Sequence, residues 1–156
     1  MIIPLKWTAE RPKEPVLMID GSCVLCHGAT HWLLRRNRRI LVAALQDEVG
    51  VLMAKELGLP RDLDTVWLLR GDKAYGRSDA VLRVLSDLGG LWRLTAVFWL
   101  VPEIIRDALY AWIARNRRAW FGARDQCSLP DKALREQCIE SVAQWMALKQ
   151  GIMTEK

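Results

Sequence analysis

The segment that most constrains this chain is a short apolar run followed by two cysteines. Val16–Ile19 (VLMI) follows a proline and precedes Asp20-Gly21, the pattern of a buried strand that enters a tight turn. From Cys23 to about Arg39 there is no proline, and apolar residues recur at three- and four-residue spacing, which predicts a helix. A strand therefore leads directly into a helix that begins at a cysteine, with Cys26 about one turn further on.

A cysteine at the start of a helix has a chemical consequence. The unpaired backbone N–H groups and the positive end of the helix dipole stabilise a thiolate, so Cys23 is the expected nucleophile of thiol-disulfide exchange. Cys26 lies on nearly the same helix face and is expected to resolve a mixed disulfide by attacking the sulfur of Cys23. The Asp20 carboxylate opposes a thiolate at Cys23, yet it can accept the proton of Cys26 when that thiol attacks. Cys23, Cys26 and Asp20 are the predicted catalytic residues.

The cysteine pair has three other interpretations. It can be half of a zinc site completed by His27, His31 or Cys127, although no second Cys-x-x-Cys follows. Cys-x-x-Cys-His also matches a c-type haem attachment site with His27 as the axial ligand, which requires export. Two buried, inert cysteines are the third interpretation. The position at a strand–helix junction favours the redox interpretation, with no metal and no cofactor.

Size and composition indicate one cytoplasmic globule. A chain of 156 residues suits a single domain, and a hydrophobic content of 51% is too high for a disordered chain. Four cysteines are too few to staple it, the N-terminus lacks a signal-peptide pattern, and no apolar stretch is long enough to span a membrane, so a cytoplasmic location is expected. The predicted domain covers residues 1–156, with a core from about 14 to 90 and a helical extension from about 91 to 150.

Strands and helices are expected to alternate through the core. The pattern predicts a strand at Ile40–Leu45, a helix at Glu48–Leu57, a β-hairpin at Thr65–Tyr75 and a helix from Ser78 to about Leu88. This order is that of an α/β protein.

The segment Leu91–Gly122 is rich in tryptophan and arginine. It predicts two helices that meet at Val101-Pro102, because proline breaks a helix and restricts the residue before it. Its tryptophans are expected to pack a helical hairpin against the sheet, and Arg115–Arg118 to be solvated at a helix end. A final helix at Asp131–Lys149 has Cys138 on its apolar face, in the core.

The chain resembles a known family. VLMIDGSCVLC, at residues 16–26, is similar to the signature of the DCC family of thiol-disulfide oxidoreductases, named for its Asp and two Cys. The resemblance implies a thioredoxin-like α/β fold, a sheet flanked by helices, here with a Trp-rich C-terminal helical extension. Cys127, in a loop-like segment, is a candidate third thiol. The similarity continues well past the motif, through Ser78-Asp79-Ala80, Val101-Pro102, Ala114–Arg117, Phe121-Gly122 and Cys127.

Thr65-Val66, Gly71-Asp72 and Ser78-Asp79 resemble a glutaredoxin pattern that binds a thiol peptide. The resemblance implies that the backbone beside Val66 pairs with the peptide, and that Ser78 and Asp79 hold its charged end unless they only cap their helix. Trp67 stands where the pattern has a cis-proline. A cis bond before Trp costs about 2.5–4 kcal/mol, so a trans bond and an altered substrate shelf are expected. Candidate substrate-binding residues are Val66, Trp67, Ser78 and Asp79, with glutathione as a candidate co-substrate.

Charge adds little about partners. The chain has 23 Lys and Arg against 18 Asp and Glu, a formal net charge of +5, and the arginine clusters stand at expected helix ends, where cations are favoured anyway. No nucleic-acid partner is expected; the expected partner is a disulfide-containing protein or a low-molecular-weight thiol. The alternative is a non-catalytic thioredoxin-like module that docks a protein or a membrane surface through its Trp-rich helices, and the sequence gives no oligomeric state.

Overall fold

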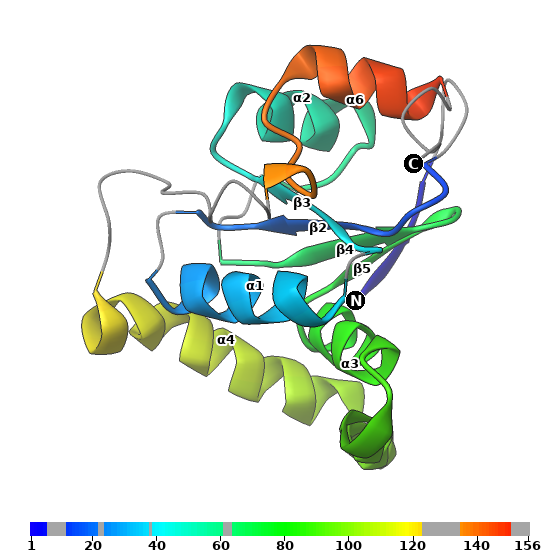
Figure 1. Ribbon diagram of the computed structural model, residues 1–156. Helices are drawn as coiled ribbons and strands as arrows, with labels where there is room; N and C mark the ends of the chain where they lie inside the picture. Colours follow the sequence, from blue (N-terminus) through cyan, green and yellow to red (C-terminus); the bar gives the residue numbers. More distant parts are fainter. Residues whose placement is uncertain (6–11, 22–23, 38, 61–63, 123–134, 151–156) are drawn as a thin grey trace.

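The computed structural model has a five-stranded mixed sheet with helices on both faces (Figure 1). It describes residues 1–5, 12–21, 24–37, 39–60, 64–122 and 135–150. The strands are β1 (Ile2–Pro4), β2 (Val16–Ile19), β3 (Leu41–Ala44), β4 (Trp67–Arg70) and β5 (Lys73–Gly76). The helices are α1 (Val24–Arg36), α2 (Glu48–Glu56), α3 (Ser78–Asp87), the 3-10 helix η1 (Gly90–Leu100), α4 (Glu103–Phe121) and α6 (Val142–Lys149).

The sheet has the thioredoxin-like topology expected from the sequence. Its strand order is β1-β5-β4-β2-β3, in which β2 and β3 are parallel and every other pair is antiparallel. The parallel pair is connected through α1, because parallel strands need a crossover, and the hairpin β4–β5 leads into α3. The short strand β1 adds to the edge beside β5 and was not predicted.

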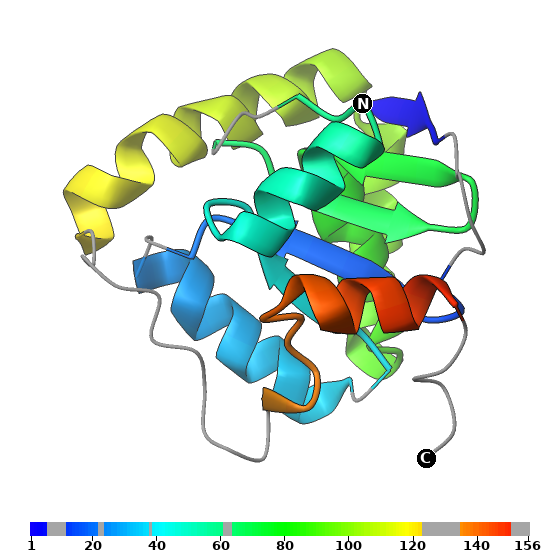
Figure 2. The same ribbon diagram turned by 90° about the horizontal axis from the view of Figure 1, so that it is seen from above.

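Two apolar cores form because successive side chains of a strand point to opposite faces of the sheet. In β2, Val16 and Met18 pack on the side of α2 and α6, whereas Leu17 and Ile19 pack on the side of α1 and α3. Figure 1 shows these two helix layers, and in the view of Figure 2 α2 and α6, which contact each other, lie together over the sheet. Burial on both faces explains the unbroken apolar run of β2.

The predicted final helix at Asp131–Lys149 is interrupted in the structure. Residues 131–134 lie outside the described part of the chain, Arg135 is helical, and residues 136–141 are not. The last helix, α6, begins at Val142, where the Ser141 side chain accepts a hydrogen bond from the Gln144 backbone and the Gln144 side chain accepts one from the Ser141 backbone. This capping box starts the helix late. Cys138 precedes it, pairs with Val42 of β3 in an isolated bridge, and is buried as expected.

The segment after α3 bends at Val101-Pro102 as predicted, but its tryptophans do not pack against the sheet. Trp92, Trp99, Trp112 and Trp120 are between 39% and 51% exposed. For Trp112 and Trp120 the reason lies in α4, which turns its polar side chains toward the protein. None of the helices in the described part of the chain is both long and apolar enough to cross a membrane.

Candidate functional site

The candidate site lies where β2 ends and α1 begins. Asp20 follows the last residue of β2 and is fully buried, and Cys26 lies in the first turn of α1, partly exposed and not in a disulfide. Cys23, the predicted nucleophile, and Cys127, the candidate third thiol, fall outside the described residues. The site is therefore built from Asp20, Cys26 and the groups that contact them.

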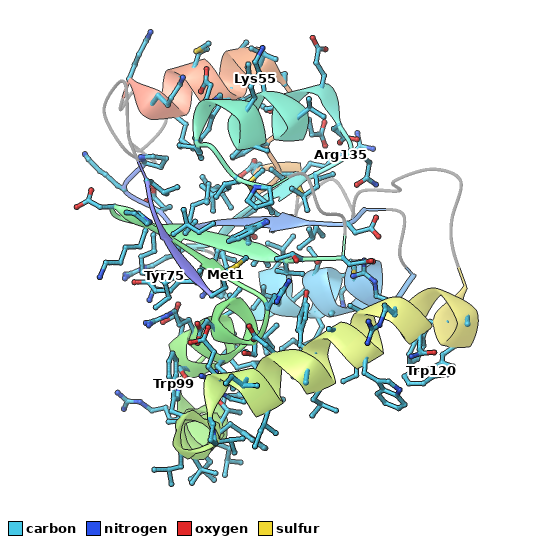
Figure 3. All side chains as sticks on the ribbon, turned by 180° about the vertical axis from the view of Figure 1, so that it is seen from behind. Met1, Lys55, Tyr75, Trp99, Trp120 and Arg135 are labelled. Atoms are coloured by element: carbon cyan, nitrogen blue, oxygen red, sulfur yellow. The ribbon has the colours of Figure 1, made fainter. Side chains whose placement is uncertain are left out.

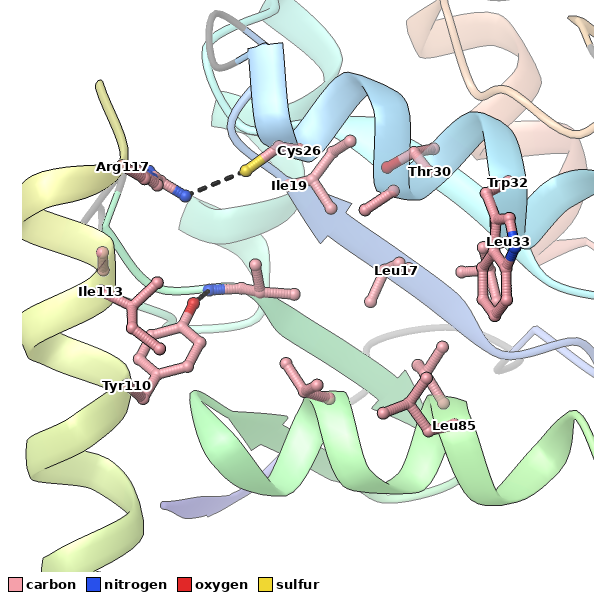
Figure 4. A pocket seen from close by; sticks show the side chains of 15 residues that line it. Leu17, Ile19, Cys26, Thr30, Trp32, Leu33, Leu85, Tyr110, Ile113 and Arg117 are labelled. Atoms are coloured by element: carbon pink, nitrogen blue, oxygen red, sulfur yellow. Dashed lines mark hydrogen bonds between the residues drawn. The ribbon is translucent and has the colours of Figure 1, made fainter. Parts of the chain in front are cut away.

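Arg117 of α4 connects the two residues (Figure 4). Its Nη2 donates to Asp20 Oδ2 at 2.9 Å, and its Nη1 donates to Cys26 Sγ at 3.0 Å. The same Nη2 lies 3.6 Å from Asp64 Oδ1. Arg117 is only 3% exposed, so the expectation of a solvated helix end is wrong for this residue, although Arg115 is exposed. A fully buried carboxylate needs a counter-charge, and Arg117 supplies it.

This arrangement places one cation beside the sulfur. A guanidinium that donates a hydrogen bond to a sulfur stabilises the thiolate relative to the thiol. Asp20 balances the charge of Arg117 and holds its planar group through the second nitrogen. The site can therefore support negative charge on Cys26 without leaving an unpaired charge in the interior.

An apolar pocket of about 230 Å³ opens beside the thiol. It lies between α1, α3, α4 and the sheet, with Cys26 and Arg117 among its lining residues (Figure 4). Thr30 and Tyr110 are its other polar residues, and aliphatic side chains together with Trp32 form the rest of the wall. A group that reaches the Cys26 sulfur through this pocket would have to be mostly apolar.

The backbone expected to pair with a substrate is already hydrogen-bonded within the chain. The Val66 N–H donates to the Tyr110 hydroxyl at 3.0 Å, and the Val66 carbonyl accepts from the Arg77 N–H at 3.1 Å. Val66 lines the pocket, but Trp67 does not: its side chain is fully buried in the core on the α2 side, over Gly76. As expected, the bond before Trp67 is trans, and the described residues contain no cis peptide bond.

Ser78 and Asp79 are likewise engaged by the chain itself. Asp79, only 2% exposed, accepts from the Met1 ammonium at 2.8 Å and from Arg106 Nη1 at 3.2 Å, and the Ser78 hydroxyl donates to Asp107. Burial alone would raise the pKa of Asp79, but the hydrogen bonds and charges of Met1 and Arg106 outweigh it and lower the pKa below 3.8. Ser78 is the first residue of α3 and not its N-cap, a position held by Arg77.

The residues missed from the sequence come from one face of α4. Arg106, Tyr110 and Arg117 are spaced by four and seven residues, so they share the side of the helix that faces the protein. This polar stripe was the signal that could have identified them. The described residues include no group of three His, Cys, Asp or Glu side chains close enough together to hold a metal ion.

A family model and a curated relative both indicate the DCC family. The family model described as DCC1-like thiol-disulfide oxidoreductase matches residues 17–123. The Bacillus subtilis (strain 168) protein YuxK, described as uncharacterized, is 36% identical over 135 residues, which cover 85% of this chain and 98% of that protein. An Arabidopsis thaliana protein described as a chloroplastic DCC family protein is 36% identical over 124 residues, covering 77% of this chain and 72% of that protein. No solved structure gives a significant match.

Proposed function

The chain belongs to the DCC1-like thiol-disulfide oxidoreductase family, and from that membership we propose that it exchanges disulfides through Cys23 and Cys26. The observation that carries the proposal is the hydrogen bond of 3.0 Å from Arg117 to Cys26 Sγ, made by a guanidinium that is also paired with a buried carboxylate. A cysteine that only filled space would not need a buried cation.

The reaction transfers two electrons from the cysteine pair to the substrate. Cys23, as a thiolate, attacks one sulfur of a substrate disulfide; that S–S bond breaks, and the leaving thiolate takes up a proton. Cys26 then gives its proton to water and attacks the sulfur of Cys23, which forms the Cys23–Cys26 disulfide and releases the second substrate thiol. A low-molecular-weight thiol or a protein dithiol reduces the pair again. A reducing compartment such as the cytoplasm suits this cycle.

Arg117 and Asp20 act in the second step. The guanidinium stabilises the negative charge that Cys26 carries before it attacks. Asp20 acts indirectly, as a positioning residue: it pairs with Arg117 and keeps the guanidinium beside the Cys26 sulfur. From the sequence, Asp20 was expected to accept the proton of Cys26, and Arg117 was not anticipated.

The geometry also supports a substrate class. The Val66 N–H is hydrogen-bonded to Tyr110, so a substrate would not pair its backbone with Val66. Asp79 is hydrogen-bonded to Met1 and Arg106, so glutathione would not bind its charged end at Asp79. The pocket beside Cys26 instead accommodates an apolar group. The proposed substrate is a disulfide with an aromatic or aliphatic group next to its sulfur.

Trapping the mixed disulfide tests this function. With a diaryl disulfide as substrate, the Cys26→Ser variant should accumulate an adduct on Cys23, visible by intact mass, because nothing resolves it. The Cys23→Ser variant should form no adduct and show no turnover with dithiothreitol as reductant. Cys138→Ser, which changes a buried thiol beside β3 that does not line the pocket, is the matched control and should retain turnover.

Two results would contradict the proposal. Turnover that survives Cys23→Ser would exclude the assigned nucleophile. A wild-type protein that reduces no disulfide would favour the alternative, a thioredoxin-like binding module, for which the exposed apolar side chains of η1 and α4 are the supporting observation.

A further inference from the structure

Helix α4 has its amphipathic faces reversed relative to an ordinary surface helix. Arg106 and Tyr110 point toward the protein and contact Asp79 and Val66, and Arg117 is buried at the thiol site. The opposite side carries large apolar side chains that are exposed to solvent. A surface helix normally turns its apolar stripe toward the core. The exposed stripe therefore needs a covering that the described residues of the chain do not provide.

The same surface continues onto η1. We call the exposed large apolar side chains of η1 and α4 the apolar face; it includes Leu91, Leu94, Leu100, Ile104, Leu109 and Trp112. Leu91, Leu100 and Ile104 are 82%, 84% and 83% exposed. In Figure 3 the side chains of η1 and α4 project outward at one end of the molecule, away from the sheet.

The shape of this face favours a lipid surface over a flat protein partner. All eleven residues of η1 are described and none of them is buried, although the segment is almost entirely apolar. An element that is apolar all round is surrounded by other apolar matter where it is stable. Helix α3 contacts one side of η1, and the exposed apolar side chains on the rest of η1 suit the boundary between lipid headgroups and acyl chains, which can enclose an inserted element from more than one direction. Tryptophan, present in both η1 and α4, prefers that boundary.

Charge around the face is positive. Arg93 of η1 and Arg115 of α4 are exposed, and the exposed Arg36 at the end of α1 stacks on Trp32, whose ring touches that of Trp92. The two acidic residues of segment 89–122 are both paired. Glu103 lies 2.7 Å from the Met1 ammonium, and Asp107 accepts from Ser78. An apolar surface with a rim of arginines complements an anionic bilayer.

We propose that the apolar face docks on the surface of an anionic lipid bilayer. In this arrangement η1 inserts to the headgroup boundary, α4 lies in the plane of the membrane, and the arginines contact anionic headgroups. The docking does not depend on disulfide exchange. It does bring the thiol site to the membrane, because Ile113 belongs both to the exposed side of α4 and to the wall of the pocket beside Cys26.

Co-sedimentation with vesicles tests the proposal on the full chain. Wild-type protein should bind vesicles of equal parts phosphatidylglycerol and phosphatidylcholine, bind phosphatidylcholine alone more weakly, and be weakened by added salt. Replacing Leu100 and Ile104 by Glu should lower the partition coefficient by about ten-fold or more, because it removes apolar contact and adds charge toward anionic lipid. Brominated lipids should quench tryptophan fluorescence in the wild type only.

The matched control is the double variant Lys55→Gln, Ala143→Glu. It also changes the net charge by −2, but at exposed positions of α2 and α6, at the opposite end of the molecule (Figure 1). It should bind vesicles nearly as the wild type does, and circular dichroism should show both double variants folded. Equal losses in the two variants, or no binding of the wild type, would overturn the proposal. So would a dimer in sedimentation equilibrium that L100E/I104E converts to monomer, since a second copy would then cover the face.

Discussion

Arg117 determines the character of the thiol site because one guanidinium contacts both Asp20 and Cys26. Asp20 is fully buried and Arg117 nearly so, which means that water does not screen their attraction strongly. Such a pair adds little net stability over apolar residues of the same size, but removing one partner leaves a charge in the interior. Stability and chemistry therefore depend on the same side chain.

We expect Arg117→Gln to lower the free energy of unfolding by about 3–5 kcal/mol, because the buried Asp20 carboxylate would lose the guanidinium that is paired with it. Urea unfolding followed by circular dichroism measures this loss. Arg115→Gln removes an exposed arginine from the same helix and should change stability by no more than about 0.5 kcal/mol. Similar losses for the two variants would mean that Asp20 and Arg117 do not form a buried pair in solution.

At the scale of elements, α2 and α6 are connected by a second, less buried ion pair. Glu56 Oε2 accepts from Lys149 Nζ at 2.8 Å and from Trp145 Nε1 at 2.9 Å. Burial raises the pKa of Glu56, but the hydrogen bonds from Lys149 and Trp145 outweigh it and lower the pKa below 4.5. A carboxyl whose pKa is lower in the folded state stabilises the fold above its unfolded pKa, and this contribution disappears as the pH falls through the folded pKa.

Glu56→Gln should therefore destabilise the protein by about 1–2 kcal/mol at neutral pH, because hydrogen bonds to a charged group are lost. The difference from the wild type should shrink as the pH falls below about 4.5 and through the lowered folded pKa of Glu56, because the wild-type carboxyl is then neutral as well. Unfolding free energies measured from pH 7 to pH 3 test both points. Glu136→Gln, an exposed carboxylate elsewhere, serves as the comparison. A difference that persists unchanged at the lowest pH would contradict the assigned pair.

The elements also show what the sequence could and could not predict. The strand, turn and helix around Asp20 and Cys26 were predicted because neighbouring residues decide them. The contact with Arg117 was not, since the residues that meet are 91 and 97 positions apart and an arginine near a helix end has an ordinary explanation. The predicted packing of α4 was wrong because it assumed that the apolar side of the helix faces the core. Strand β1, three residues long, carries too little pattern to predict.

At the scale of the whole molecule, the protein has a well-buried central sheet and an end with many exposed apolar side chains. Strands β2 and β4 lie inside the sheet between the two cores and are almost entirely buried. The apolar face lies at the end formed by η1 and α4, beyond the layer of α1 and α3 (Figure 1). Stability is therefore expected to vary along the chain rather than to be uniform.

Hydrogen exchange of the lipid-free protein should reveal this gradient. The paired amides of β2 and β4 should exchange most slowly, near the rate set by global unfolding, and those of η1 fastest among the helices. Peptide-resolved mass spectrometry of the exchanging protein measures both. Protection of η1 equal to that of β2, at protein concentrations where the chain is monomeric, would mean that η1 is covered in a way this structure lacks.

Helix α4 blocks an expected peptide-binding site through contacts within the same chain. The side chains responsible are Tyr110, Arg106 and Asp107. They form hydrogen bonds with Val66, Asp79 and Ser78. These are the residues that the glutaredoxin-like pattern would use to bind a peptide. An incoming peptide would have to compete with a ligand on the same chain, whose effective concentration is about millimolar or higher. Generic peptides should therefore be poor competitors, which leaves discrimination among substrates to the shape of the apolar pocket.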